Sequence, residues 1–173
     1  MSKKRLLIAL ILLIVAGVKS YSQIAYSGKI ELGYLAFKHQ LLDVDPGPNY
    51  RGSHLDKGQN GKEISMSNGI SIHDKWYTGI GVAYLNFEGI NGISVYSDVD
   101  YRLLKTKLTP VFNMKLGYNH SWNQYENGTK SVLFELGVGV CYKLSKKRAI
   151  YIQSGFSVIQ EASFTPFRIG FKF

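Results

Sequence analysis

From residue 26 to the C-terminus, apolar and polar residues alternate with a period of two, which is the pattern of half-buried β-strands. Runs of this kind, bounded by turn residues, predict strands at 26–37, 63–72, 76–87, 93–103, 108–120, 131–144, 149–159 and 164–173. Most of them reach the roughly 9–11 residues with which a tilted strand crosses a bilayer. We therefore expect an all-β protein, an eight-stranded antiparallel up-and-down transmembrane β-barrel.

The connections between these runs differ in length. Short connections lie at 73–75, 104–107 and 145–148, longer ones at 38–62, 88–92 and 121–130, and a brief one at 160–163. Membrane barrels place short turns at one end and longer loops at the other. With an even number of strands, both termini should lie at the end that carries the short turns.

The last ten residues form the most specific motif of the chain. Because alternate side chains of a strand point to the same side, the segment 164–173 has an apolar side and a polar or small side. The apolar side consists of Phe167, Ile169, Phe171 and Phe173, and the other side of Pro166, Arg168, Gly170 and Lys172.

This strand resembles the terminal strand of bacterial outer-membrane β-barrels, which ends in Phe with apolar or aromatic residues at alternate positions. The resemblance implies a small eight-stranded barrel located in the cell outer membrane, among outer-membrane lipid and lipopolysaccharide. It also implies that the four apolar side chains are an assembly signal for the barrel-assembly machinery. We expect such a protein to be a monomer.

The N-terminal residues have the three parts of a secretory signal. Basic Lys3, Lys4 and Arg5 precede an apolar run at 6–18 and a small-x-small site at 20–22. The apolar run has thirteen residues, fewer than the roughly twenty of a membrane-spanning helix. We therefore expect residues 1–22 to be a cleaved signal peptide and residues 23–173 to form the barrel domain.

The glycines indicate which face of the strands points inward. Gly33, Gly69, Gly79, Gly81, Gly117, Gly137, Gly139, Gly155 and Gly170 share the phase of the polar residues in their strands. An eight-stranded barrel has an interior only just wide enough for side chains, so small residues are needed there. The polar face should therefore line the lumen, and the apolar residues should face lipid.

The same phase places many charged residues in the lumen. The acids are Glu31, Glu63, Asp98, Asp100 and Glu135, and the bases are Lys29, Arg102, Lys115, Lys143, Arg168 and Lys172. Charges removed from water persist when they are paired and hydrogen-bonded. We expect an interior salt-bridge network that leaves the barrel plugged, with its centre at Asp98, Asp100 and Arg102.

Composition excludes several other classes of function. The formal net charge of +9 falls to about +5 without the four bases of the N-terminal segment, and the remaining bases are spread along the chain. Nucleic-acid binding would need them clustered on one face. The single Cys141 allows no intrachain disulfide, and the four histidines lack the spacing of metal ligands. We expect no cofactor, metal or nucleic-acid partner.

The connection at 38–62 is the place where recognition is expected. Its Asp43, Asp45 and Asp56 lack the pattern of a calcium loop, which needs a further oxygen ligand and a closing Glu. Long connections commonly carry binding function. Its contact residues, by this reasoning, are Tyr50, Arg51 and His54.

One group of residues suggests catalysis. His120 and Ser121, with Glu126 nearby, faintly resemble the His/Ser/Glu set of the lipid A 3-O-deacylase barrels, which hydrolyse an ester at the outer leaflet. Those enzymes separate His and Ser by one residue, whereas here the two are adjacent and should point to opposite faces. We therefore expect no catalysis.

Three functions remain as hypotheses. The first is an integral outer-membrane barrel with a structural, adhesion or recognition role through its extracellular loops. The second is an outer-leaflet hydrolase like the lipid A deacylases. The third is a soluble, lipocalin-like periplasmic carrier, which would hold its apolar residues inside the barrel.

Overall fold

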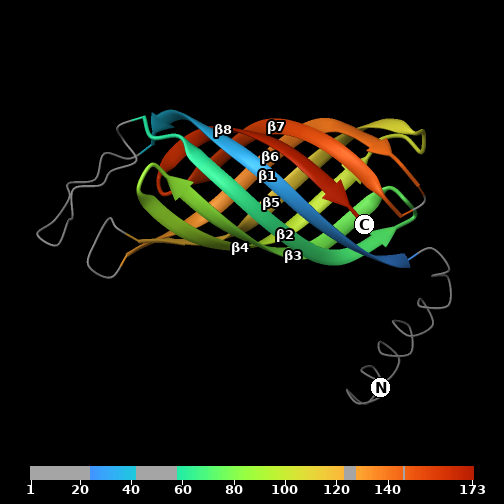
Figure 1. The fold of residues 1–173 in the computed structure, drawn as a ribbon, viewed down its shortest axis with the longest axis horizontal. Helices are drawn as coiled ribbons and strands as arrows, with labels where there is room; N and C mark the ends of the chain where they lie inside the picture. Colours follow the sequence, from blue (N-terminus) through green and yellow to red (C-terminus); the bar gives the residue numbers. More distant parts are fainter. Residues whose placement is uncertain (1–23, 42–57, 123–127, 146) are drawn as a thin grey trace, which may run out of the picture.

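The computed structural model describes residues 24–41, 58–122, 128–145 and 147–173. Its strands are β1 (Ile24–Gln40), β2 (Gly61–Ile72), β3 (Trp76–Phe87), β4 (Ile90–Arg102), β5 (Leu108–Ser121), β6 (Thr129–Lys143), β7 (Ala149–Ile159) and β8 (Ala162–Lys172). They follow one another around a single closed barrel (Figure 1). The predicted fold class and all eight strands are confirmed, whereas the predicted signal peptide at 1–22 lies outside the described residues.

The barrel closes by pairing its first strand with its last. β1 pairs with β8 in antiparallel register from Lys29 opposite Lys172 to Gln40 opposite Ala162, with one register shift between Phe37 and His39. Every strand therefore has two neighbours, and no row of backbone N–H and C=O groups is left at an edge. Among the described residues, no helix is long and apolar enough to cross a membrane.

The two ends of the barrel differ. One end, called the terminal end below, carries the start of β1, the C-terminus and the turns at 73–75, 103–107 and 144–148 (Figure 1). The other end, called the loop end, carries the connections at 41–60 and 122–128 and the turns at 88–89 and 160–161. The start of β1 and the C-terminus thus lie at the end that carries the short turns, as predicted.

One predicted loop is a tight turn. The longer connection expected at 88–92 consists of Glu88 and Gly89 alone, because β4 begins at Ile90. Both residues have positive φ, 51° and 113°, as do Gln160 and Glu161 at 53° and 61°. Two-residue hairpins favour such conformations because they match the strand twist. The long connections at the loop end are thus 41–60 and 122–128, and Tyr50, Arg51 and His54 lie outside the described residues.

The outer face of the barrel is apolar. Leu116 is 53% exposed and Val138 is 56% exposed, whereas Arg168 is 3% exposed and points inward. Other exposed members of the belt are Ile30, Leu32, Ile64, Met66, Ile80, Val82, Val95, Phe112, Met114, Val132, Leu136, Val140, Ile152, Phe156 and Ile169. Aromatic side chains lie near the strand ends, where Trp76 and Tyr101 contact each other at a centroid distance of 4.5 Å. A transmembrane barrel has this arrangement, and a soluble carrier has the reverse.

Two cross-strand pairs of glycines let the barrel wall close tightly. Gly69 lies opposite Gly79 between β2 and β3, and Gly137 lies opposite Gly155 between β6 and β7. A Cβ atom on Gly69 or on Gly155 would lie 2.0 Å from a backbone carbonyl oxygen of the neighbouring strand. These positions therefore require glycine because the backbones approach too closely for a side chain.

The apolar belt predicts how an arginine on the outer face affects stability. Leu116→Arg, midway along β5, should lower the free energy of unfolding by about 2–4 kcal/mol, because a cation at the bilayer midplane is poorly solvated. Leu104→Arg, in the turn at the terminal end, is the matched control and should cost about 0–1 kcal/mol. Urea unfolding in lipid vesicles measures both values, and equal losses would contradict a lipid-facing belt.

Candidate functional site

The lumen of the barrel contains a core of buried charged side chains, called the ionic core below. Its members are Lys29, Glu31, Glu63, Asp98, Asp100, Lys115, Glu135 and Arg168, all buried. They project from β1, β2, β4, β5, β6 and β8. Because the strands alternate between lipid and lumen, each of these residues is surrounded by the barrel wall.

Lys29 joins β1 to β4 across the lumen. Its Nζ atom lies 2.7 Å from Oδ2 of Asp98 and 3.1 Å from both carboxylate oxygens of Asp100. The amide of Asn113 donates to the same two carboxylates at 2.8 Å, and Ser67 donates to Asp98 at 2.9 Å. Two adjacent carboxylates can therefore remain close together, because one ammonium group and neutral donors compensate them.

Glu31 lies at the centre of the second group. Its carboxylate is paired with Lys115 of β5. It also accepts hydrogen bonds from Tyr151 at 2.8 Å and Ser65 at 3.1 Å. The Lys115 Nζ atom lies 5.0 Å from the centroid of the Tyr96 ring, a distance at which a cation is attracted to the ring face.

Arg168 joins three strands in the third group. Its Nε and Nη2 atoms donate to Oε1 and Oε2 of Glu63 at 3.2 and 2.5 Å. Its Nη1 atom is paired with Glu135 of β6. One guanidinium therefore binds two carboxylates from opposite sides, using the fork geometry that suits arginine and not lysine.

The structure includes in the network two of the three residues predicted as its centre. Asp98 and Asp100 contact Lys29, and Arg102 makes no ion pair with any described residue. Lys143 lies near the terminal end, 3.9 Å from the exposed Asp74, and does not pair with an interior acid. The strand phase identified which residues face the lumen, but the partners depend on how the strands stagger around the barrel.

Sequence reasoning missed an apolar layer inside the barrel at the loop end. Its buried members are Leu35, Ala83, Leu85, Phe87, Ile90, Tyr96, Leu133, Ile159, Ala162 and Phe164. The rings of Phe87 and Phe164 lie 5.3 Å apart. The expectation of a polar lumen is therefore wrong at this end. The signal was present, because Leu35, Leu85 and Leu133 share the phase of the interior charges.

The candidate catalytic residues do not form a dyad in the described part of the chain. The Ser121 side chain is buried, and its hydroxyl lies 3.3 Å from Oδ1 of Asn119. His120 is on the opposite face of β5, with its ring 5.2 Å from that of Trp122. Glu126 lies outside the described residues. Among the residues described, no group of His, Cys, Asp and Glu could hold a metal ion.

The predicted assembly signal lies along the outer face of β8. Phe167, Ile169, Phe171 and Phe173 are all exposed, and the rings of Phe171 and Phe173 are stacked at 6.2 Å. The backbones of Phe173 and Gly28 exchange hydrogen bonds at 2.8 and 2.9 Å. The terminal strand is thus paired along its length while its apolar side chains stay accessible from the lipid side.

Comparison with known proteins finds solved structures of similar fold. No family model and no curated protein matches the chain. Among solved structures, the barrel is similar to Neisserial surface protein A (NspA), with a TM-score of 0.65 and 11% sequence identity over 86% of this chain and 97% of that chain.

Two further solved structures are similar to this barrel. The N-terminal β-barrel domain of Pseudomonas aeruginosa OprF has a TM-score of 0.53 and 11% identity, over 84% of this chain and 97% of that chain. The outer membrane enzyme PagL has a TM-score of 0.52 and 9% identity, over 83% of this chain and 97% of that chain. At such identities the likeness shows a shared fold alone. With its apolar outer belt, this fold supports the predicted location in the cell outer membrane.

Proposed function

We propose that this protein is a small structural or recognition barrel of the outer membrane, in which the loops bind a partner and the lumen stabilises the scaffold. The observation that carries the proposal is the content of the lumen. The ionic core bridges strands on opposite sides of the barrel, and the apolar layer packs above it at the loop end. Such a lumen favours a plugged scaffold over a conduit for solutes.

The connection at 41–60 is the proposed recognition element. It is the longest connection between two strands of the barrel. It lies at the loop end, which in outer-membrane barrels faces the cell exterior. Lipid and lipopolysaccharide around the belt, and the barrel-assembly machinery acting on β8, are the other partners that we propose for a monomeric protein.

The two alternative functions have less support. A lipid A deacylase needs an imidazole on the serine hydroxyl, and His120 and Ser121 lie on opposite faces of β5. A periplasmic carrier would keep its apolar surface inside, and here the ionic core occupies the lumen. Similarity of fold to an enzyme does not by itself imply a shared activity.

The ionic core predicts that replacing a base inside it lowers the free energy of unfolding far more than replacing a base outside it. Arg168→Met should lower the free energy of unfolding by about 3–5 kcal/mol, because Glu63 and Glu135 then remain buried without a counter-charge. Lys143→Met is the matched control and should cost less than about 1 kcal/mol, because its ion pair is long and partly exposed. Urea unfolding in vesicles compares the two.

A triple variant distinguishes the cost of leaving two carboxylates without a counter-charge from the cost of losing the arginine side chain. Adding Glu63→Gln and Glu135→Gln to Arg168→Met removes both orphaned charges and should recover most of the lost stability. If the triple variant is less stable than Arg168→Met alone, or if Lys143→Met is equally harmful, the proposed role of the ionic core is wrong.

The recognition role predicts that the loop can be removed without loss of the barrel. Replacing residues 42–57 by a short Gly-Ser linker should change the free energy of unfolding by only about 1 kcal/mol, because loop-closure entropy varies slowly with length. It should abolish adhesion of cells displaying the barrel to a panel of immobilised proteins and glycans. A linker in place of residues 123–127 is the control.

Two outcomes of the adhesion experiment would contradict the proposed function. In the first, cells displaying the unaltered barrel bind no surface of the panel above the level of cells without it. In the second, the loop-replaced barrel folds, as shown by its heat-modifiable gel mobility, and binds as well as the unaltered one.

A further inference from the structure

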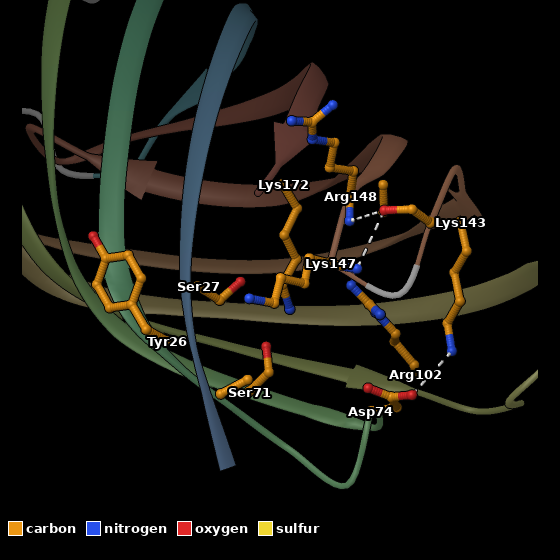
Figure 2. Close-up of a pocket in the computed structure, with 12 residues that line it drawn as sticks. Tyr26, Ser27, Ser71, Asp74, Arg102, Lys143, Lys147, Arg148 and Lys172 are labelled. Carbon is orange, nitrogen blue, oxygen red and sulfur yellow. Dashed lines mark hydrogen bonds and ion pairs between the residues drawn. The ribbon is translucent and has the colours of Figure 1, made fainter. Parts of the chain in front are cut away.

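A small basic cavity lies at the terminal end of the barrel (Figure 2). Its volume is about 30 Å³. Five of its lining residues are basic, namely Arg102, Lys143, Lys147, Arg148 and Lys172, and Asp74 is its single acid. The cavity therefore concentrates positive charge that its own residues do not balance.

Two of these cations are buried without a carboxylate. Lys172 is 5% exposed and Arg102 is 9% exposed, and neither forms an ion pair with a described residue. Asp100 of the ionic core already accepts hydrogen bonds from Lys29 and Asn113. The Lys172 Nζ atom lies 4.7 Å from the centroid of the Tyr77 ring, which compensates the charge only in part. In Figure 2 the side chains of Arg102 and Lys172 extend toward one another in the cavity.

One hydroxyl group completes the donor set. The Ser71 hydroxyl is buried and has no hydrogen-bond partner among the described residues. The Ser27 hydroxyl also lines the cavity, but it already donates a hydrogen bond to the carbonyl oxygen of Phe173 at 3.2 Å. A buried polar atom without a partner carries a desolvation cost that a ligand atom can remove.

The size of the cavity limits its ligand. A single water needs at least roughly 10–15 Å³ of cavity volume, so a cavity of about 30 Å³ suits a few oxygen atoms better than a sugar ring or a nucleobase. The guanidinium of Arg102, the ammonium of Lys172 and the hydroxyl of Ser71 match the terminal oxygens of a phosphoryl group, which carries more charge and more acceptors than a carboxylate.

We propose that this cavity binds a phosphoryl group on the periplasmic side, with Arg102 and Lys172 as the principal ligands and Ser71 as a hydrogen-bond donor. Lys147 and Arg148 lie at the cavity in the turn after β6 and attract the anion. Two sources supply this chemistry at the inner face of the membrane, namely free inorganic phosphate and the headgroup of a phospholipid.

The test uses the full barrel in a maltoside detergent that contains no phosphate. Inorganic phosphate and a short-chain phosphatidic acid are titrated separately and binding is measured by calorimetry. Arg102→Gln and Lys172→Gln should each weaken binding roughly tenfold, the change expected from the loss of one charge-assisted hydrogen bond. Lys105→Gln is the matched control, because Lys105 is an exposed base in the turn at 103–107, outside the cavity.

Each outcome has one meaning, provided that heat-modifiable mobility shows each variant to be folded. Phosphate binding that depends on Arg102 and Lys172, but not on Lys105, supports a site for the free ion. Binding of the phosphatidic acid alone, with the same dependence, supports a headgroup site. Binding of neither probe, or equal weakening by Lys105→Gln, would overturn the proposal and leave the loop-based function unaffected.

Discussion

The absence of water in the bilayer is the constraint on which this structure depends. Backbone N–H and C=O groups in hydrocarbon must be paired within the protein, so the sheet has to close on itself. Closure with eight strands leaves a lumen barely wide enough for side chains. The polar half of every strand is forced into that space, and the charges there must neutralise one another. The pairing of β1 with β8 and the ionic core are two consequences of this constraint.

The constraint also explains how the lumen is divided along the barrel axis. Near the loop end the inward positions are apolar and pack on one another. In the middle, Lys29, Lys115 and Arg168 each bind acids from other strands. At the terminal end, neither Arg102 nor Lys172 forms an ion pair with an acid in the part of the chain that the structure describes. The middle of the lumen is thus cross-linked by ion pairs, the loop end is filled by apolar packing, and the terminal end holds the basic cavity.

The fold could be predicted from the sequence because the period of two is a local property. Eight alternating runs gave eight strands, and the phase of the glycines correctly placed Arg168 inside and Val138 outside. The ion-pair partners of the charged residues in the lumen could not be predicted in the same way. Lys29 meets Asp98 and Asp100 because the strand stagger brings positions of β1 and β4 to the same height, and no local pattern encodes that stagger. The turn at 88–89 was missed because its residues resemble those of a longer loop.

The central claim is that strand phase separates a lipid-facing belt from a filled lumen. Leu133 and Leu136 test it within one strand, since the first is 3% exposed and the second 48% exposed on the outer face. The measurement is the methyl NMR spectrum of the barrel in lipid nanodiscs, with nuclear Overhauser effects to the acyl chains. Leu136 should show strong effects to the acyl chains and Leu133 none. Strong effects to Leu133 with none to Leu136 would mean that the apolar belt does not face the lipid.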